Sequence, residues 1–126
     1  MKEYTLRQSA VKSADIYMRL LTLLTTRKRF LAPDVTAAKL AEELNCSPRN
    51  ISMALQSSTG RNFSHLLNDL RLREVCRRLT SPRYASSTVE DIGLACGYKT
   101  RQAFYIAFQR HLGTTPSLWR EQNTQH

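Results

Sequence analysis

Arginine and glutamine side chains occur at matching places in two separate segments of the chain. Arg49 follows a Ser-Pro pair, and Arg101 and Gln102 follow Thr100. Serine and threonine are preferred N-caps, so these side chains lie in the first turn of two predicted helices. A guanidinium pairs with both major-groove acceptors of guanine, and a glutamine amide pairs with adenine. The chemistry that these residues offer is recognition of base edges in duplex DNA.

The elements that would position these side chains form a pattern that occurs twice, in residues 40–51 and 92–104. In each copy a small residue, Ala41 or Gly93, allows two helices to cross closely. Four positions later Asn45 or Gly97 tolerates positive φ, as a tight turn between helices requires. The pattern predicts two helix-turn-helix motifs, a motif that places its second helix in the major groove.

The rest of the chain is also expected to be helical. Helical spacing of apolar residues predicts a helix over 13–27, preceded by a flexible lead-in over 1–12. We expect further helices over 37–44, 48–57 and 62–80, the first two capped at Thr36 and Ser47. A capping box at Thr88–Asp91 opens the next helix, Thr100 caps one that ends before Gly113, and Thr115 caps a last short helix. No strand pattern is found. The fold class is predicted as all-α, with about seven helices and two helix-turn-helix subdomains (13–60 and 82–126) joined by a long central helix (61–81).

The composition favours a polyanionic partner. The 126 residues include 19 Lys and Arg against 10 Asp and Glu, a net charge of +9. Nucleic acid is favoured over a membrane surface, because the chain has no basic amphipathic anchor helix and no apolar run long enough to span a bilayer. We therefore expect a cytoplasmic, nucleoid-associated protein that makes no membrane contact.

Enzymatic and metal-dependent functions are not predicted. No Ser/His/Asp or paired-carboxylate arrangement is found, so we expect no catalytic residue. Cys46, Cys76 and Cys96 lack the close pairing of a zinc site or disulfide framework and are interpreted as small buried side chains. No metal and no cofactor are expected.

With these motifs in place, the chain resembles the DNA-binding domain of AraC/XylS-type bacterial transcription regulators over about residues 13 to 121. The resemblance depends on an ordered series in the second half: Ile92-Gly93, Gly97-Tyr98, Phe104, Phe108, Gly113-Thr114-Thr115-Pro116 and Trp119-Arg120. It implies a regulator that binds beside a promoter and positions RNA polymerase, as an activator does. The departures include Gly93 for a usual alanine.

Exposed positions early in each second helix are the candidates for base contact. In the first motif these are Arg49, Asn50, Ser52 and Met53; in the second they are Lys99, Thr100, Arg101, Gln102, Tyr105 and Ile106. By the resemblance, Arg49, Ser52 and Met53 fall on base-contacting positions. Relatives commonly carry a basic residue where Met53 and Ile106 stand. Met53 either contacts a thymine methyl group or reads no base.

Phosphate contacts are expected from backbone N–H groups at helix starts and from basic side chains. The candidates are Thr36, Arg61, Thr88, Arg110, Thr115 and Arg120, with Lys99 as a further basic residue. Arg71, in contrast, is expected to tie the two lobes together through hydrogen bonds.

The leading hypothesis is a monomeric reader of an asymmetric site. Its two recognition helices would enter successive major-groove segments one turn, about 34–36 Å, apart. The chain is expected to be the output domain of a larger sensor-regulator. The alternative is a protein-interaction adaptor with a degenerate helix-turn-helix fold, an alternative that Met53 and Ile106 keep open.

Overall fold

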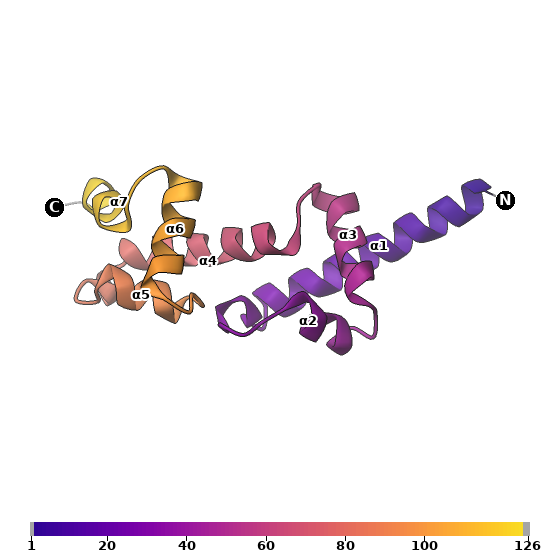
Figure 1. Cartoon of the computed structure of the whole chain (residues 1–126), viewed down its shortest axis with the longest axis horizontal. Helices are drawn as coiled ribbons and strands as arrows, with labels where there is room; N and C mark the ends of the chain where they lie inside the picture. Colours follow the sequence, from indigo (N-terminus) through magenta and orange to yellow (C-terminus); the bar gives the residue numbers. More distant parts are fainter. Residues whose placement is uncertain (1, 125–126) are drawn as a thin grey trace. The chain divides into compact units, whose positions relative to one another are not determined.

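The computed structural model describes residues 2–124, with side chains from Lys12 onward. Its helices are α1 (Lys2–Thr25), α2 (Ala37–Glu43), α3 (Pro48–Thr59), α4 (Phe63–Leu79), α5 (Val89–Ala95), α6 (Arg101–Leu112) and α7 (Pro116–Asn123), with 3-10 turns at Arg29–Leu31 and Pro82–Tyr84 (Figure 1). No strand occurs between residues 2 and 124. The prediction of an all-α fold with about seven helices is confirmed.

The described residues divide into two compact units. The first comprises residues 2–29 and 34–67, and the second comprises residues 30–33 and 68–124. The first residues of α4, which lies in the predicted linker helix 61–81, group with the first unit and the rest with the second. The short segment 30–33 also joins the second unit.

Helix α1 begins at Lys2, so the prediction that the helix starts at Ser13, after a lead-in over 1–12, was wrong about the start. The stretch between Lys2 and Ser13 contains neither glycine nor proline. Once a helix is nucleated downstream, each added residue contributes a backbone hydrogen bond, and nothing in this stretch interrupts its propagation.

The core of the first unit lies where α3 packs against α1 and α2 (Figure 1). The side chains of Leu20, Leu24, Leu40, Ile51 and Leu55 are fully buried there. Each such burial contributes roughly 1.5–3 kcal/mol to stability. The turn between α2 and α3 contains Asn45 with a φ of 55°, which confirms the predicted left-handed residue.

The second unit is built around two aromatic side chains of α6. Phe104 and Phe108 are fully buried, and Trp119 of α7 packs edge-on against Phe108 with ring centroids 6.2 Å apart. A Cβ placed on Gly93 of α5 would lie 2.4 Å from the Phe104 ring. The predicted close crossing at this small residue is therefore confirmed.

All five predicted N-caps form. The side-chain oxygens of Thr36, Ser47, Thr88, Thr100 and Thr115 each accept a backbone N–H from the first turn of the following helix. The reciprocal capping box, predicted at Thr88–Asp91, is found instead at Ser47, where the Asn50 side-chain oxygen accepts a hydrogen bond from the Ser47 N–H. Each cap contributes about 1 kcal/mol.

Gly97, between α5 and α6, combines backbone strain with lack of space. Its φ is 108°, and a Cβ there would lie 2.5 Å from Arg71 Nε and 3.0 Å from the Phe30 carbonyl oxygen. We expect Gly97→Ala to lower the free energy of unfolding by about 3 kcal/mol or more, because the strain and the clash act together. Urea denaturation of the purified variant measures this loss.

Gly113→Ala is the matched control within the same unit. Gly113 also has positive φ, 71°, but no atom lies within 4 Å of its would-be Cβ. The expected loss is therefore only about 1–2 kcal/mol. Equal losses for the two variants would contradict the assigned clash at Gly97.

Candidate nucleic-acid interface

Helices α3 and α6 are built on the same plan, one in each unit. Each has 12 residues, begins after a hydroxyl N-cap and ends at a glycine in the left-handed region, with φ of 69° at Gly60 and 71° at Gly113. In both, the fourth and eighth residues are fully buried: Ile51 and Leu55 in α3, Phe104 and Phe108 in α6. Because buried residues at this spacing share one face, they determine which side chains point to solvent.

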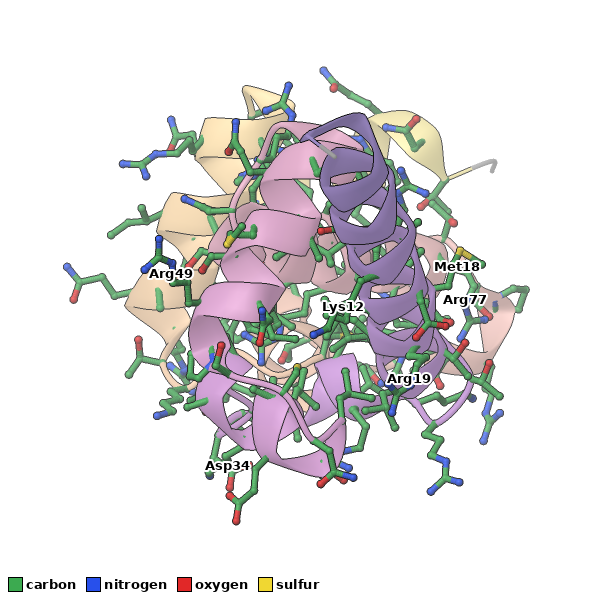
Figure 2. The ribbon with its side chains drawn as sticks, turned by 90° about the vertical axis from the view of Figure 1, so that its right-hand side faces the viewer. Lys12, Met18, Arg19, Asp34, Arg49 and Arg77 are labelled. Atoms are coloured by element: carbon green, nitrogen blue, oxygen red, sulfur yellow. The ribbon has the colours of Figure 1, made fainter. Side chains whose placement is uncertain are left out.

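The outward faces carry the predicted hydrogen-bonding residues at corresponding places. The second helical residue, Arg49 in α3 and Gln102 in α6, is exposed, as is Arg101 beside Gln102. Figure 2 shows Arg49 on the side of α3 away from Met18 and Arg19 of α1. Each unit therefore exposes hydrogen-bonding side chains in the first turn of its second motif helix, α3 or α6.

Further predicted base-contacting residues are also exposed. These are Ser52, Met53, Lys99, Thr100 and Ile106. The Thr100 hydroxyl oxygen accepts the Ala103 N–H at 3.0 Å, so it serves first as the cap of α6.

Asn50 contributes mainly to the local structure of α3. Its side-chain oxygen accepts hydrogen bonds from the Ser47 N–H at 3.0 Å and from the Ser47 hydroxyl at 2.8 Å. Only its amide N–H groups are left for a partner outside the helix. Asn50 therefore has a capping role, and base contact through its amide N–H groups stays a prediction.

Tyr105 has a hydrogen-bond partner that no sequence pattern predicted. Its hydroxyl donates a hydrogen bond to the Glu90 carboxylate of α5. This hydrogen bond is the main reason that the pKa of Glu90 lies below its usual value, and the positive charge of Arg101 lowers it further. Tyr105 is half-buried, so its hydroxyl is committed to α5 rather than free for a base. The two residues lie on different helices, and no local pattern links them.

The predicted phosphate contacts at helix starts differ in their electrostatics. The first turns of α2 and α7, after Thr36 and Thr115, contain no acidic residue, whereas the first turn of α5, after Thr88, contains Glu90 and Asp91. Acidic side chains already use the positive end of the helix dipole and repel phosphate. Anion binding is therefore favoured near Thr36 and Thr115 and opposed near Thr88.

The guanidinium of Arg120, predicted as a phosphate contact, is occupied by hydrogen bonds within the second unit. It donates to three backbone carbonyl oxygens, of Leu79 at 3.0 Å and of Tyr84 and Ser87 at 2.7 Å each. These bonds hold the connection between α4 and α5 against α7. The other basic candidates, Arg61, Arg110 and Lys99, are exposed.

Arg71 is buried, with 8% of its surface exposed. It donates to the carbonyl oxygens of Phe30 and Ala32, both at 2.8 Å, and its guanidinium lies 5.5 Å from the centre of the Tyr98 ring. The expected hydrogen bonds are present, but all these partners belong to the second unit. Arg71 therefore attaches segment 30–33 to that unit.

The cysteines have the environment of structural residues. Cys96 is buried and Cys76 half-buried, and burial raises the pKa of each thiol to about 11. Over the described residues, no group of three or more His, Cys, Asp or Glu side chains is arranged to hold a metal ion. The described helices include none that is long and apolar enough to cross a membrane.

The different roles of two arginines of the second unit lead to a stability prediction. We expect Arg120→Ala to lower the free energy of unfolding by about 2–3 kcal/mol, because three carbonyl groups lose a charged donor. The exposed Arg110 gives the control, since Arg110→Ala leaves stability within about 0.5 kcal/mol of the parent. Urea denaturation measures both, and an Arg120→Ala variant as stable as the parent contradicts the assigned role.

Comparison with known proteins identifies the family. A family described as "Helix-turn-helix domain" matches residues 40–122. The HTH-type transcriptional activator RhaR of Escherichia coli is 30% identical over 87 residues, which are 69% of this chain. The match spans only 30% of the length of RhaR.

Solved structures show the same fold. The C-terminal domain of AraT, a response regulator from Geobacillus stearothermophilus, is 26% identical with a TM-score of 0.77, over 88% of this chain and 87% of that domain. An AraC-type regulator from Chromobacterium violaceum is 21% identical with a TM-score of 0.74, over 88% of this chain and 94% of that one, and so supports the fold alone. The chain therefore belongs to the AraC-type helix-turn-helix domains. These are the DNA-binding domains of bacterial transcription regulators.

Proposed function

We propose that this chain is a sequence-specific double-stranded DNA-binding domain of a transcription regulator, with α3 and α6 as its recognition helices. The observation that carries the proposal is the shared plan of these helices. Each buries its fourth and eighth residues and exposes hydrogen-bonding side chains in its first turn. This is the part of a recognition helix that meets base edges in the major groove.

Each exposed side chain suits a particular base. Arg49 and Arg101 pair with guanine, and Gln102 pairs with adenine. Since the two helices carry different residues at corresponding positions, the DNA site is asymmetric. Its two halves lie in successive segments of the major groove, one for each helix.

Attraction to the phosphate backbone comes from the positive charge of the chain. The net charge is +9, and Arg61, Lys99 and Arg110 are exposed. Basic side chains release counterions from DNA when they bind phosphates, which supplies affinity without sequence preference. The N-termini of α2 and α7, near Thr36 and Thr115, contain no acidic residue in the first turn and add backbone N–H donors.

The domain acts as the output part of a larger regulator. In support, the match covers 30% of the activator RhaR, and the AraT structure is the C-terminal domain of a response regulator. As proposed, the domain binds DNA as a monomer and positions RNA polymerase at the promoter, in the cytoplasm at the nucleoid. It has no catalytic role.

Arg101 tests the base-reading part of this proposal on a duplex selected from a random pool. We expect Arg101→Ala to weaken binding to the selected duplex about 5- to 150-fold, the loss of one bidentate base contact, with little change on random duplex. We expect Arg49→Ala to lose the preference for guanine in the half of the site that α3 binds. Fluorescence anisotropy at fixed salt measures both.

Arg110→Ala is the control, because a phosphate contact lowers affinity equally on the selected and random duplexes and reduces the salt slope by about one. If Arg101→Ala also weakens both duplexes equally, Arg101 is a phosphate contact and the base-reading assignment is wrong.

A protein-interaction adaptor is the second candidate, favoured by the exposure of Met53 (51%) and Ile106 (52%). Salt titration separates the two functions. For a DNA-binding domain, the logarithm of the binding constant falls linearly as log[salt] rises, and the selected site is preferred at every salt concentration. For an adaptor we expect no duplex to be enriched from the pool, and that result would falsify the proposed function.

A further inference from the structure

Two large apolar side chains lie on the outward faces of the recognition helices. Since α3 begins at Pro48 and α6 at Arg101, Met53 and Ile106 are both the sixth helical residue. Their exposed fractions are nearly equal, 51% and 52%. The two units thus expose an apolar side chain at the same point of a shared plan.

Each apolar side chain lies one turn after a residue that can pair with a purine. Arg49 and Met53 are four residues apart in α3, and Gln102 and Ile106 are four apart in α6. Residues at this spacing share one helix face. When Arg49 contacts a base in the major groove, Met53 therefore faces the same groove. The same holds for Gln102 and Ile106.

The major groove offers one apolar group to such a side chain. It is the 5-methyl group of a pyrimidine, present on thymine and on methylated cytosine and absent from cytosine and uracil. The other groups on the groove edges are hydrogen-bond donors and acceptors, which neither a thioether nor an aliphatic chain satisfies well.

We propose that Met53 and Ile106 are specificity-determining residues, each of which packs against the 5-methyl group of a pyrimidine in one half of the DNA site. The inference rests on the proposed function and adds the chemistry of one base to each half. Each half-site then combines a purine, read by Arg49 or Gln102, with a 5-methylpyrimidine about one helical turn of the protein further along.

Single replacement of thymine by deoxyuridine tests the inference, because it removes only the methyl group. We expect one thymine in each half of the selected duplex whose replacement weakens binding about fourfold, the effect of burying one methyl group. The parent chain, Met53→Ala and Ile106→Ala are compared on the same duplexes. Met53→Ala should abolish the thymine preference in one half only, and Ile106→Ala in the other half only.

The two sources of the methyl group are separated by a cytosine series. At each sensitive position, cytosine and 5-methylcytosine replace thymine, with the matching guanine opposite. If the methyl group alone is read, 5-methylcytosine binds more tightly than cytosine by the same factor as thymine over uracil. If the helix also reads the neighbouring oxygen of thymine, both cytosine duplexes bind weakly while the thymine preference still depends on Met53 or Ile106. Either result supports the contact, and the second assigns it to thymine.

Met18→Ala is the control for the loss of an exposed methionine. Met18 is 60% exposed on α1, and Figure 2 shows it on the side of the first unit opposite Arg49. This variant should keep the full thymine preference in both halves. A parent chain without any thymine preference, or variants that retain the preference of the parent, would overturn the inference while the proposed function stands. Failure to enrich any duplex would overturn both.

Discussion

The burial of two side chains four residues apart in each recognition helix is the constraint on which the rest of the structure depends. Ile51 and Leu55 in α3, and Phe104 and Phe108 in α6, have no exposed surface. Rotating either helix about its axis would bring large apolar groups into water at roughly 1.5–3 kcal/mol each. The rotation is therefore determined by the core, and it leaves Arg49 and Met53 of α3 and Gln102 and Ile106 of α6 exposed. The packing of the interior therefore decides which side chains are available for the proposed base recognition.

Charge alone does not identify the side chains that meet DNA in this chain. Arg71 and Arg120 contribute to the net positive charge, yet the hydrogen bonds of both guanidinium groups go to backbone carbonyl oxygens within the second unit. A planar guanidinium with several donors suits such a role, because one side chain can satisfy carbonyls from separate segments. The arginines at the starts of α3 and α6 are exposed instead. Position in the fold separates the arginines that stabilise the unit from those available to DNA.

The two units use one backbone plan with different surfaces. Cap, length, buried positions and terminal glycine correspond between α3 and α6, whereas their outward residues differ. In the second unit the Glu90 carboxylate adds a negative charge close to Arg101 and holds the Tyr105 hydroxyl. The corresponding fifth residue of α3 is the exposed Ser52. A shared plan with unlike surfaces suits a reader whose two half-sites differ in sequence.

Most of the fold could be predicted from the sequence, because the signals involved act over a few residues. Hydroxyl N-caps, the left-handed Asn45 and Gly97, and the apolar spacing of Phe104 and Phe108 each specify local conformation directly. The start of α1 was missed because no breaker or cap marks it, and the capping box formed at Ser47 and Asn50 rather than at Thr88.

The outward faces of α3 and α6 were therefore determined by the sequence itself, through local spacing. The partners of Tyr105 and Arg120 were decided only by the tertiary structure. Glu90 is 15 residues from Tyr105, and the carbonyl groups that Arg120 binds are 33 to 41 residues away. No periodicity or cap relates residues at such separations. Their hydrogen bonds exist because the core brings different helices and loops together, and that packing decides which polar side chains remain free to bind DNA.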